Sequence, residues 1–341
     1  MKDWKRRPIF LIVIWLSSAA LPAQQTPFEL TRPLSLFKVR VIDGSNNPVV
    51  GLGASEFQVS SDRNSHEIAY FREISDTLIS IAVLLDVGPS MGDPEILRSK
   101  RLIFDLIHRL GVEDRIQIAT YDREICFLST LTSDRFELLE ALANISPGMA
   151  CQGRESRWAL EGGDAKVPIG GSEVPRGRES GAAPDTTTAG QGALRLSFRT
   201  GQSLSGNAIT ESLSRLKATG NQRIILAISG GLPNVGESTL QDLRIEEVNL
   251  FVIDAGSAAE DLLSLGVTKS SRERLVKGSG GFLFTLEKVL DQVEGLRTLF
   301  KNYYLLGLLD DPDNRLDSDA VQFHSRSGYR VTAMPVSAPE N

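Results

Sequence analysis

The segment LLDVGPSMGD, residues 84–93, holds the residues of this sequence whose types and spacing best suit chemistry. Asp86 follows an apolar run, and Ser90 comes four residues later between two glycines. An aspartate followed by hydroxyl groups can ligate a hard cation such as Mg²⁺. The stretch GPSMG also matches G-x-S-x-G, the pattern that exposes a serine nucleophile on a sharp turn. A third interpretation has no chemistry, with Asp86 and Ser90 bonded to nearby backbone groups.

A serine hydrolase built on Ser90 would need an acid and a histidine later in the chain. Asp254 and His324 are the only suitable pair. The surroundings disfavour this alternative, because the nucleophile turn of that fold follows several parallel strands and none is predicted before Leu78. His324 also lies within an alternating strand pattern rather than in a loop.

The elements that must position this loop alternate between strands and helices from Leu78 onward. The apolar run LISIAVLL is typical of a strand buried on both faces, and residues 93–110 have helical spacing. This alternation predicts an α/β fold, a doubly wound and mainly parallel sheet with helices on both faces. Ligands of such sheets bind beyond the carboxyl ends of the strands, where Asp86 would lie. Asp122, near the end of a second strand, either faces the same crevice or is a solvated turn residue.

The expected domain organisation has a small β module at 34–74 and an α/β domain at 78–310. Residues 148–203 are rich in Gly, Ser, Pro and Thr, which indicates a flexible insertion in that domain. A β-hairpin extension at 311–336 would close the chain and complete the fold class.

The N-terminal segment 1–23 has a basic start, a short apolar run and a small-residue stretch. This order predicts a secretory signal peptide that is cleaved after Ala23, and an uncleaved segment would be a membrane anchor instead. The formal net charge is −6, and the mature chain is more acidic because the removed segment is basic. An acidic chain without a basic cluster argues against nucleic acid and anionic membranes as partners.

The two cysteines of the chain, Cys126 and Cys151, would be able to form a disulfide in an exported protein. Cys126 ends a strand pattern and Cys151 opens a polar loop, so the sequence leaves their pairing open. Two cysteines without a histidine cluster do not make a zinc site.

Several motifs together resemble the von Willebrand factor type A (VWA) domain. Asp86 and Ser90 match two positions of the D-x-S-x-S motif that opens its metal-ion-dependent adhesion site. SGNAITESL resembles the stretch that brings the threonine of the third loop, and IILAISGGLPN resembles the strand that ends in Thr-Asp-Gly. The resemblance covers residues 78–300 apart from the insertion. It implies a binding protein in which a partner's carboxylate completes the coordination of Mg²⁺.

The whole chain further resembles a bacterial family of VWA-related proteins common in acidobacteria. VRVIDGSNNPVVGLGASEFQV matches the β module that precedes the domain in that family, and LRTLFKNYYLLGL resembles the stretch that follows it. The resemblance implies an exported, non-enzymatic protein-interaction module of the adhesion type. Its place would be the periplasm, the cell envelope or the medium, and its partner would be a protein.

Three positions depart from the adhesion-site pattern. Gly88 stands at the first serine, Asn207 at the third-loop threonine and Gly230 at the fourth-loop aspartate. Asn207 could still offer an amide oxygen, whereas Gly230 has no side-chain ligand. We therefore expect a degenerate adhesion site, with Asp86, Ser90, Asn207 and Gly230 as binding residues and no certain cofactor. The alternative within the same fold is a functional Mg²⁺ site with Asp86, Ser90 and Asn207 as ligands.

Overall fold

The computed structural model describes residues 34–61, 64–122, 125–148, 204–217, 219–230, 237–256, 269–309, 316–317 and 320–336 of the 341 in the chain. The expected signal peptide at 1–23 and nearly all of the expected insertion at 148–203 lie outside these residues. Within the described part, no helix is both long and apolar enough to cross a membrane.

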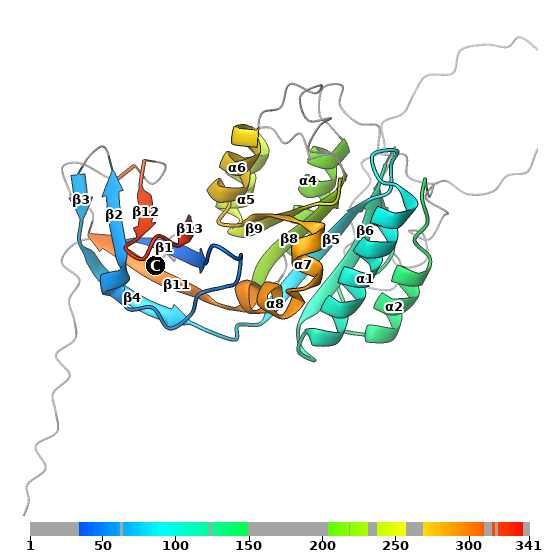
Figure 1. The fold of residues 1–341 in the computed structure, drawn as a ribbon, viewed down its shortest axis with the longest axis horizontal. Coiled ribbons are helices and arrows are strands. Elements are labelled where there is room, and N and C mark those ends of the chain that lie inside the picture. The colour runs from blue at the N-terminus through cyan, green and yellow to red at the C-terminus, as the bar shows by residue number, and fades with distance from the viewer. Residues whose placement is uncertain are drawn as a thin grey trace, which may run out of the picture.

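A six-stranded sheet forms the centre of the larger part of the chain (Figure 1). Its order is β10-β9-β8-β5-β6-β7, and every neighbouring pair except β6 and β7 is parallel. The strands are β5 (Ile79–Asp86), β6 (Arg115–Tyr121), β7 (Ile125–Phe127), β8 (Gln222–Ser229), β9 (Val248–Asp254) and β10 (Leu283–Thr285).

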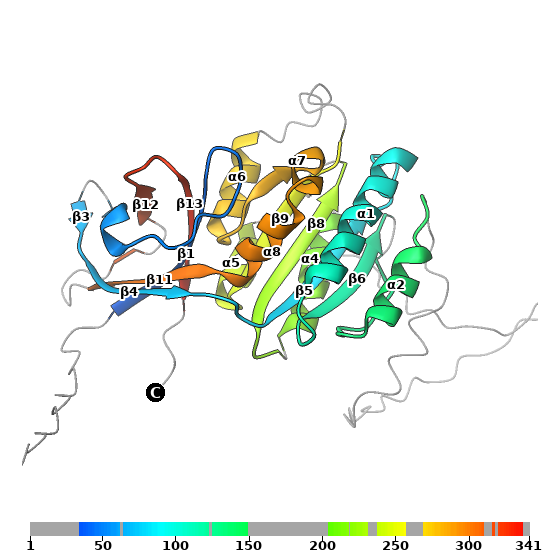
Figure 2. The same cartoon turned by 60° about the horizontal axis from the view of Figure 1, so that its bottom comes forward.

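Helices cover both faces of this sheet (Figure 2). One face packs against α1 (Asp93–Arg109), α2 (Arg135–Ala143), α7 (Leu286–Leu290) and α8 (Val293–Lys301). The other packs against α4 (Leu204–Leu216), α5 (Glu237–Ile245) and α6 (Lys269–Gly278). The prediction of a doubly wound, mainly parallel α/β sheet is therefore confirmed.

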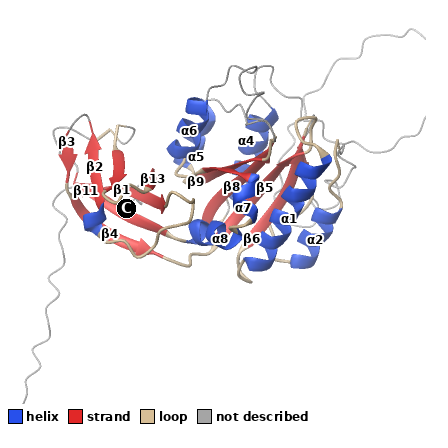
Figure 3. Ribbon diagram, viewed as in Figure 1, coloured by secondary structure: helices blue, strands red, loops and turns tan. Residues whose placement is uncertain are grey.

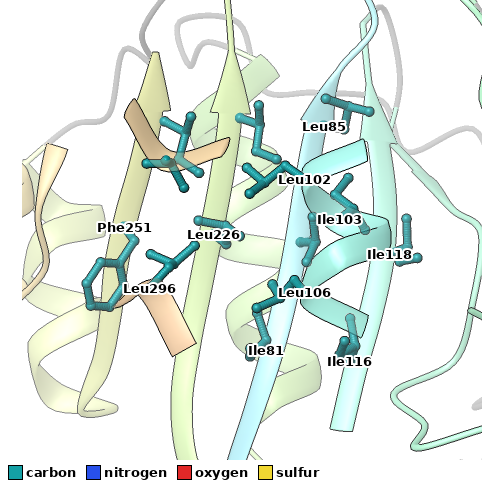
Figure 4. Close-up of a cluster of buried hydrophobic side chains, with 14 of the residues drawn as sticks. Ile81, Leu85, Leu102, Ile103, Leu106, Ile116, Ile118, Leu226, Phe251 and Leu296 are labelled. Atoms are coloured by element: carbon teal, nitrogen blue, oxygen red, sulfur yellow. The ribbon is translucent and has the colours of Figure 1, made fainter. Parts of the chain in front are cut away.

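The central strand β5 shows why the apolar run forms this structure. All eight of its residues are buried, as expected when helices cover both faces of a strand. Its alternate residues face opposite sides, so Ile81 and Leu85 join the core under α1, while Leu84 joins the core under α4. Figure 4 shows Ile81 and Leu85 beside the apolar face of α1.

Two smaller antiparallel sheets form the rest of the molecule (Figure 3). The four-stranded sheet has the order β13-β1-β11-β4, and the three-stranded sheet has the order β12-β2-β3. Their strands are β1 (Leu34–Ile42), β2 (Phe57–Ser61), β3 (Asn64–His66), β4 (Ile68–Ile74), β11 (Tyr303–Leu309), β12 (Gln322–Ser325) and β13 (Arg330–Val336), and a short 3-10 turn spans Ala54–Glu56. One apolar cluster between the two sheets holds them together.

The pairing of these strands corrects the expected C-terminal hairpin at 311–336. β12 pairs with β2 and β13 pairs with β1, so the two strands belong to different sheets although only a turn separates them. β11 lies within the expected domain at 78–310 but pairs with β1 and β4. The β module at 34–74 is thus completed by strands from the other end of the chain.

A buried arginine joins the four-stranded sheet to the larger part of the molecule. Arg40 of β1 is 1% exposed. Its Nε donates to the carbonyl of Leu299 at 3.0 Å, and Nη1 donates to the carbonyl of Gly280 at 3.4 Å. Burial lowers the pKa of Arg40 to about 10. At the margin of this contact, Lys38 Nζ lies 2.8 Å from Glu247 Oε2.

Candidate functional site

The polar side chains at the carboxyl edge of the central sheet gather around Asp86. Asp86 ends β5 opposite Tyr121 of β6, and Ser229 ends the neighbouring strand β8. By the alternation of the strands, all three point to the face that α4 covers. Asp86 is 7% exposed, so its carboxylate lies beneath the surface of this edge.

Three donors within the chain satisfy the Asp86 carboxylate. Oδ1 accepts a hydrogen bond from the backbone N–H of Gly88 at 2.9 Å. Oδ2 accepts from the Ser90 hydroxyl at 2.7 Å and from the Ser229 hydroxyl at 2.8 Å. Hydrogen bonds to an ionised acceptor are stronger than neutral ones. The network therefore stabilises a buried negative charge and fixes the loop that follows β5.

Tyr121 lies beside this charge and is itself buried. Burial raises the pKa of the Tyr121 hydroxyl, the negative charge of Asp86 raises it further, and the Ser229 hydroxyl opposes part of the shift. Tyr121 therefore stays neutral at ordinary pH. It does not supply a base or an anionic ligand to the site.

Gly88 separates two carboxylates. A Cβ atom at this position would lie 2.9 Å from Asp122 Oδ1 and 3.2 Å from Asp86 Oδ1. The serine of the adhesion-site pattern would therefore fit here only if Asp122 moved. Asp122 was expected either to face the crevice or to be a solvated turn residue. In the structure it faces the crevice, beside Gly88.

Gly230 is covered by the main chain of the first loop. A Cβ atom at Gly230 would collide with the carbonyl oxygen of Ser90, and it would lie 3.1 Å from Met91 Sδ. The space that an aspartate side chain would need is thus filled by backbone. Gly230 lies against the first loop, where it contributes close packing and no side-chain ligand.

Asn207 lies in the first turns of α4, the helix above this face. Its Nδ2 atom is buried and has no hydrogen-bond partner within the described ranges. No bond joins it to Asp86 or Ser90 in that part of the chain. The structure thus brings Asp86, Ser90 and Gly230 together and places Asn207 on the covering helix, without a hydrogen bond to them among the described residues.

The triad of the hydrolase alternative is not assembled, so this alternative is wrong. The Ser90 hydroxyl donates to Asp86 rather than to a histidine. His324 lies in β12, which pairs with β2 in the three-stranded sheet at the opposite end of the molecule from the loop between β5 and α1 (Figure 1). Asp254 ends β9 and accepts from the backbone N–H of Gly256 at 3.0 Å.

Ser229 is the site residue that sequence reasoning missed. It occupies the threonine position of the Thr-Asp-Gly stretch, so the resemblance carried a signal for it. A serine at the end of a buried strand otherwise looks like any turn residue.

The side chains around Asp86 include few of the ligands that a Mg²⁺ site needs. A hard divalent cation takes about six oxygen ligands, and carboxylates supply most of the charge. Here Asp86 is already satisfied by internal donors, and Gly88 and Gly230 bring no ligand. No group of three or more His, Cys, Asp or Glu that could hold a metal occurs among the residues described.

No family model matches the chain, and no curated protein matches it. Several solved structures are distantly similar to it. An aerotolerance-related membrane protein from Bacteroides fragilis is 14% identical, with a TM-score of 0.41 over 65% of this chain and 98% of that one. BatB from Bacteroides thetaiotaomicron is 14% identical, with a TM-score of 0.39 over 64% and 98%. Proximal thread matrix protein 1 from the mussel byssus, with a zinc-occupied MIDAS motif, is 12% identical, with a TM-score of 0.40 over 74% and 50%.

At these identities and TM-scores the neighbours carry no argument about the family or function of this chain. The chain itself has a doubly wound α/β fold, with a mainly parallel sheet, two helical layers and Asp86 at the carboxyl edge of the central strand.

Proposed function

We propose that this chain is an exported, non-enzymatic interaction module that binds a protein through the carboxyl edge of its parallel sheet without a metal. The observation that carries the proposal is the internally satisfied Asp86 carboxylate beneath a loop that packs on Gly230. A fixed loop with exposed residues and no open metal position suits recognition better than turnover. The membership of a VWA-related family common in acidobacteria belongs to the same proposal.

The surface that would contact the partner is the loop between β5 and α1. Pro89 and Ser90 are exposed there, above the buried network. The backbone N–H of Gly148 donates to the carbonyl of Val87 at 2.9 Å, and α4 begins at Leu204 above the same face. The interval between Gly148 and Leu204 therefore begins and ends near this edge of the sheet.

Export rests on the N-terminal sequence and on a cysteine. Cys126 of β7 is buried and disulfide-bonded, and stable disulfides are typical of oxidising compartments outside the cytosol. The only other cysteine of the chain, Cys151, lies outside the described residues. We infer cleavage after Ala23, which intact-mass measurement of the protein recovered from a periplasmic or culture fraction would test. An intact N-terminus would indicate an anchor instead.

Site-specific photocrosslinking tests the binding face. A photoreactive amino acid replaces Ser90, and in a matched control it replaces Glu113, which is exposed in the loop before β6 at the opposite edge of the sheet. We expect a protein from the envelope fraction to be crosslinked from position 90, with and without EDTA, and not from position 113. Crosslinks that EDTA abolishes would support the Mg²⁺-dependent adhesion module instead. Equal crosslinking from both positions would contradict the proposed face.

A further inference from the structure

The strand β4 has a free edge. It pairs with β11 on one side, and no strand in the described part of the chain pairs with it on the other. In Figures 1 and 2 it runs along the outer margin of the four-stranded sheet. Its sequence, IAYFREI, contains no proline or lysine, which commonly keep edge strands from pairing with other chains, and the charged residues in this strand are Arg72 and Glu73.

A bulge sets which side chains of β4 share a face. Leu308 pairs with Ile68 and Gly307 with Tyr70, so Ala69 has no partner in β11. Ile68 and Phe71 therefore both pack on the apolar cluster between the two small sheets, although they are three residues apart. Tyr70, 37% exposed, lies on the opposite face against Gly307.

This arrangement makes β4 complementary to itself in one antiparallel register. If Ile68 of one copy lies opposite Phe71 of another, a two-fold axis also places Phe71 opposite Ile68, and the apolar layer continues across both copies. The same register places Glu67 opposite Arg72, twice. Glu67 and Arg72 are both exposed, and neither forms an ion pair in the residues that the structure covers.

We propose that two copies of this chain pair antiparallel along β4, with Glu67 of each copy opposite Arg72 of the other. The four-stranded sheets then form one continuous sheet, which covers the partly exposed side chains of Ile68 and Phe71. The carboxyl edge around Asp86 belongs to a different sheet, so the dimer does not depend on the binding function proposed above.

Sedimentation velocity of the mature chain over a wide concentration range tests the proposal. We expect a monomer–dimer equilibrium that Glu67→Arg and Arg72→Glu each weaken by about tenfold or more, because each change places like charges opposite each other at both contacts. The double variant Glu67→Arg/Arg72→Glu should recover the affinity of the parent chain. Glu113→Arg, an exposed charge reversal far from β4, is the matched control and should leave the dissociation constant unchanged.

Circular dichroism and thermal unfolding should show that all four variants fold like the parent, since the altered side chains are exposed. A chain that stays monomeric at every concentration would overturn the proposal. So would single variants that dimerise as tightly as the parent, or a double variant that does not recover. If deletion of residues 24–33 is needed before a dimer appears, then that segment occupies the β4 edge and the proposal is wrong for the mature chain.

Discussion

At the scale of single residues, the site is organised around one buried carboxylate and two glycines. The three donors to Asp86 come from two places, namely its own loop at Gly88 and Ser90 and the end of β8 at Ser229. Asp86 therefore fixes the path of the loop through these hydrogen bonds, and it also gives the site its negative charge. The glycines, Gly88 and Gly230, account for the ligands that the site lacks. Carboxylate oxygens fill the space beside Gly88, and backbone fills the space beside Gly230.

Replacement of Asp86 should destabilise the protein even without any ligand. In Asp86→Asn the charge is lost and an N–H₂ group replaces one acceptor, so at least one buried donor is left unsatisfied. We expect a loss of about 2–3 kcal/mol in the free energy of unfolding, measured by urea denaturation. Ser90→Ala should cost less, about 0.5–1.5 kcal/mol, because Ser90 is exposed. Equal stability of Asp86→Asn and the parent would contradict the network.

Any side chain introduced at Gly230 should lower the stability of the protein. In Gly230→Ala the new Cβ meets the Ser90 carbonyl, which belongs to the main chain and is held by the Asp86 network, so we expect a cost of about 1–3 kcal/mol. Gly220→Ala is the control, because no described atom lies near its Cβ position, and it should be close to neutral. Gly230→Asp should not create Mg²⁺ binding, so a thermal shift with millimolar Mg²⁺ in that variant would refute this explanation.

At the scale of elements, a buried ion pair ties the end of α8 to the start of the central sheet. Lys301 Nζ lies 3.1 Å from Asp114 Oδ2 and 3.0 Å from Asp76 Oδ1. Asp114 also accepts from the backbone N–H groups of Ile79 and Gly111 at 3.2 and 2.7 Å. The end of α8, the chain between β4 and β5 and the loop between α1 and β6 therefore meet at one buried ammonium group, at the edge of the sheet opposite Asp86.

Removal of the Lys301 charge should be costly. Lys301→Met keeps most of the side-chain volume but leaves the Asp114 carboxylate buried without a cation, which we expect to cost about 3 kcal/mol in chemical denaturation. Lys277→Met is the matched control, since Lys277 is exposed and lies 4.0 Å from Glu273, and it should change stability by less than about 0.5 kcal/mol. Similar effects of the two changes would contradict the structural role of Lys301.

Asp76 gives this cluster a dependence on pH. The hydrogen bond from Lys301 and then its charge lower the pKa of Asp76 from its ordinary value of 3.8. A carboxyl group whose pKa is lowered on folding adds stability that is fully present above its ordinary pKa and is lost as the pH falls through the folded value. Asp76→Asn should therefore be less stable than the parent at pH 7, and thermal unfolding should show the difference shrinking below pH 3.8. Asn suits the site because Asp76 has a φ of 53°, which Asn tolerates.

Much of the larger sheet follows from sequence because local patterns determine it. An apolar run such as Ile79–Leu85 has few alternatives to a strand covered on both sides, and a polar residue directly after it must lie at the carboxyl edge. Asp86 and Ser90 were predictable for this reason. The exclusion of side chains at Gly230 was not, because it depends on how closely the Ser90 main chain passes over it.

The partners of the terminal strands were not predictable either. Alternation in β12 and β13 shows that each is a strand, but it carries no information about which strand it pairs with. A short turn between two strands suggests a hairpin by default. Here β13 pairs with β1 and β12 pairs with β2, both from the other end of the chain.

At the scale of the whole molecule, the two parts of the chain share a buried interface around Arg40. Its guanidinium donates to carbonyls of α8 and of the turn after α6, and its Cζ lies 5.7 Å from the ring centroid of Phe251 in β9. The interface thus contains groups from the four-stranded sheet, both helical layers and the parallel sheet.

The molecule should therefore unfold in one cooperative step. Arg40→Ala removes two hydrogen bonds to buried carbonyls and leaves a cavity, so we expect a cost of about 3–5 kcal/mol. The transition should stay single when followed by near- and far-ultraviolet circular dichroism. Arg101→Ala, an exposed change on α1, should be nearly neutral. Two separate transitions in the parent chain would contradict a shared interface.

The strand order β13-β1-β11-β4 has a kinetic consequence. β1 is the first described strand to be synthesised, and both of its neighbours come from the last described part of the chain. The apolar residues of β1 therefore remain unpaired until synthesis is almost complete. All strands of the parallel sheet, which lies between β1 and β11 in the sequence, are synthesised earlier. Loss of the final strand, β13, by truncation or early proteolysis would leave one edge of β1 unpaired. Chains shortened before β13 should accumulate as aggregates rather than as a stable smaller domain.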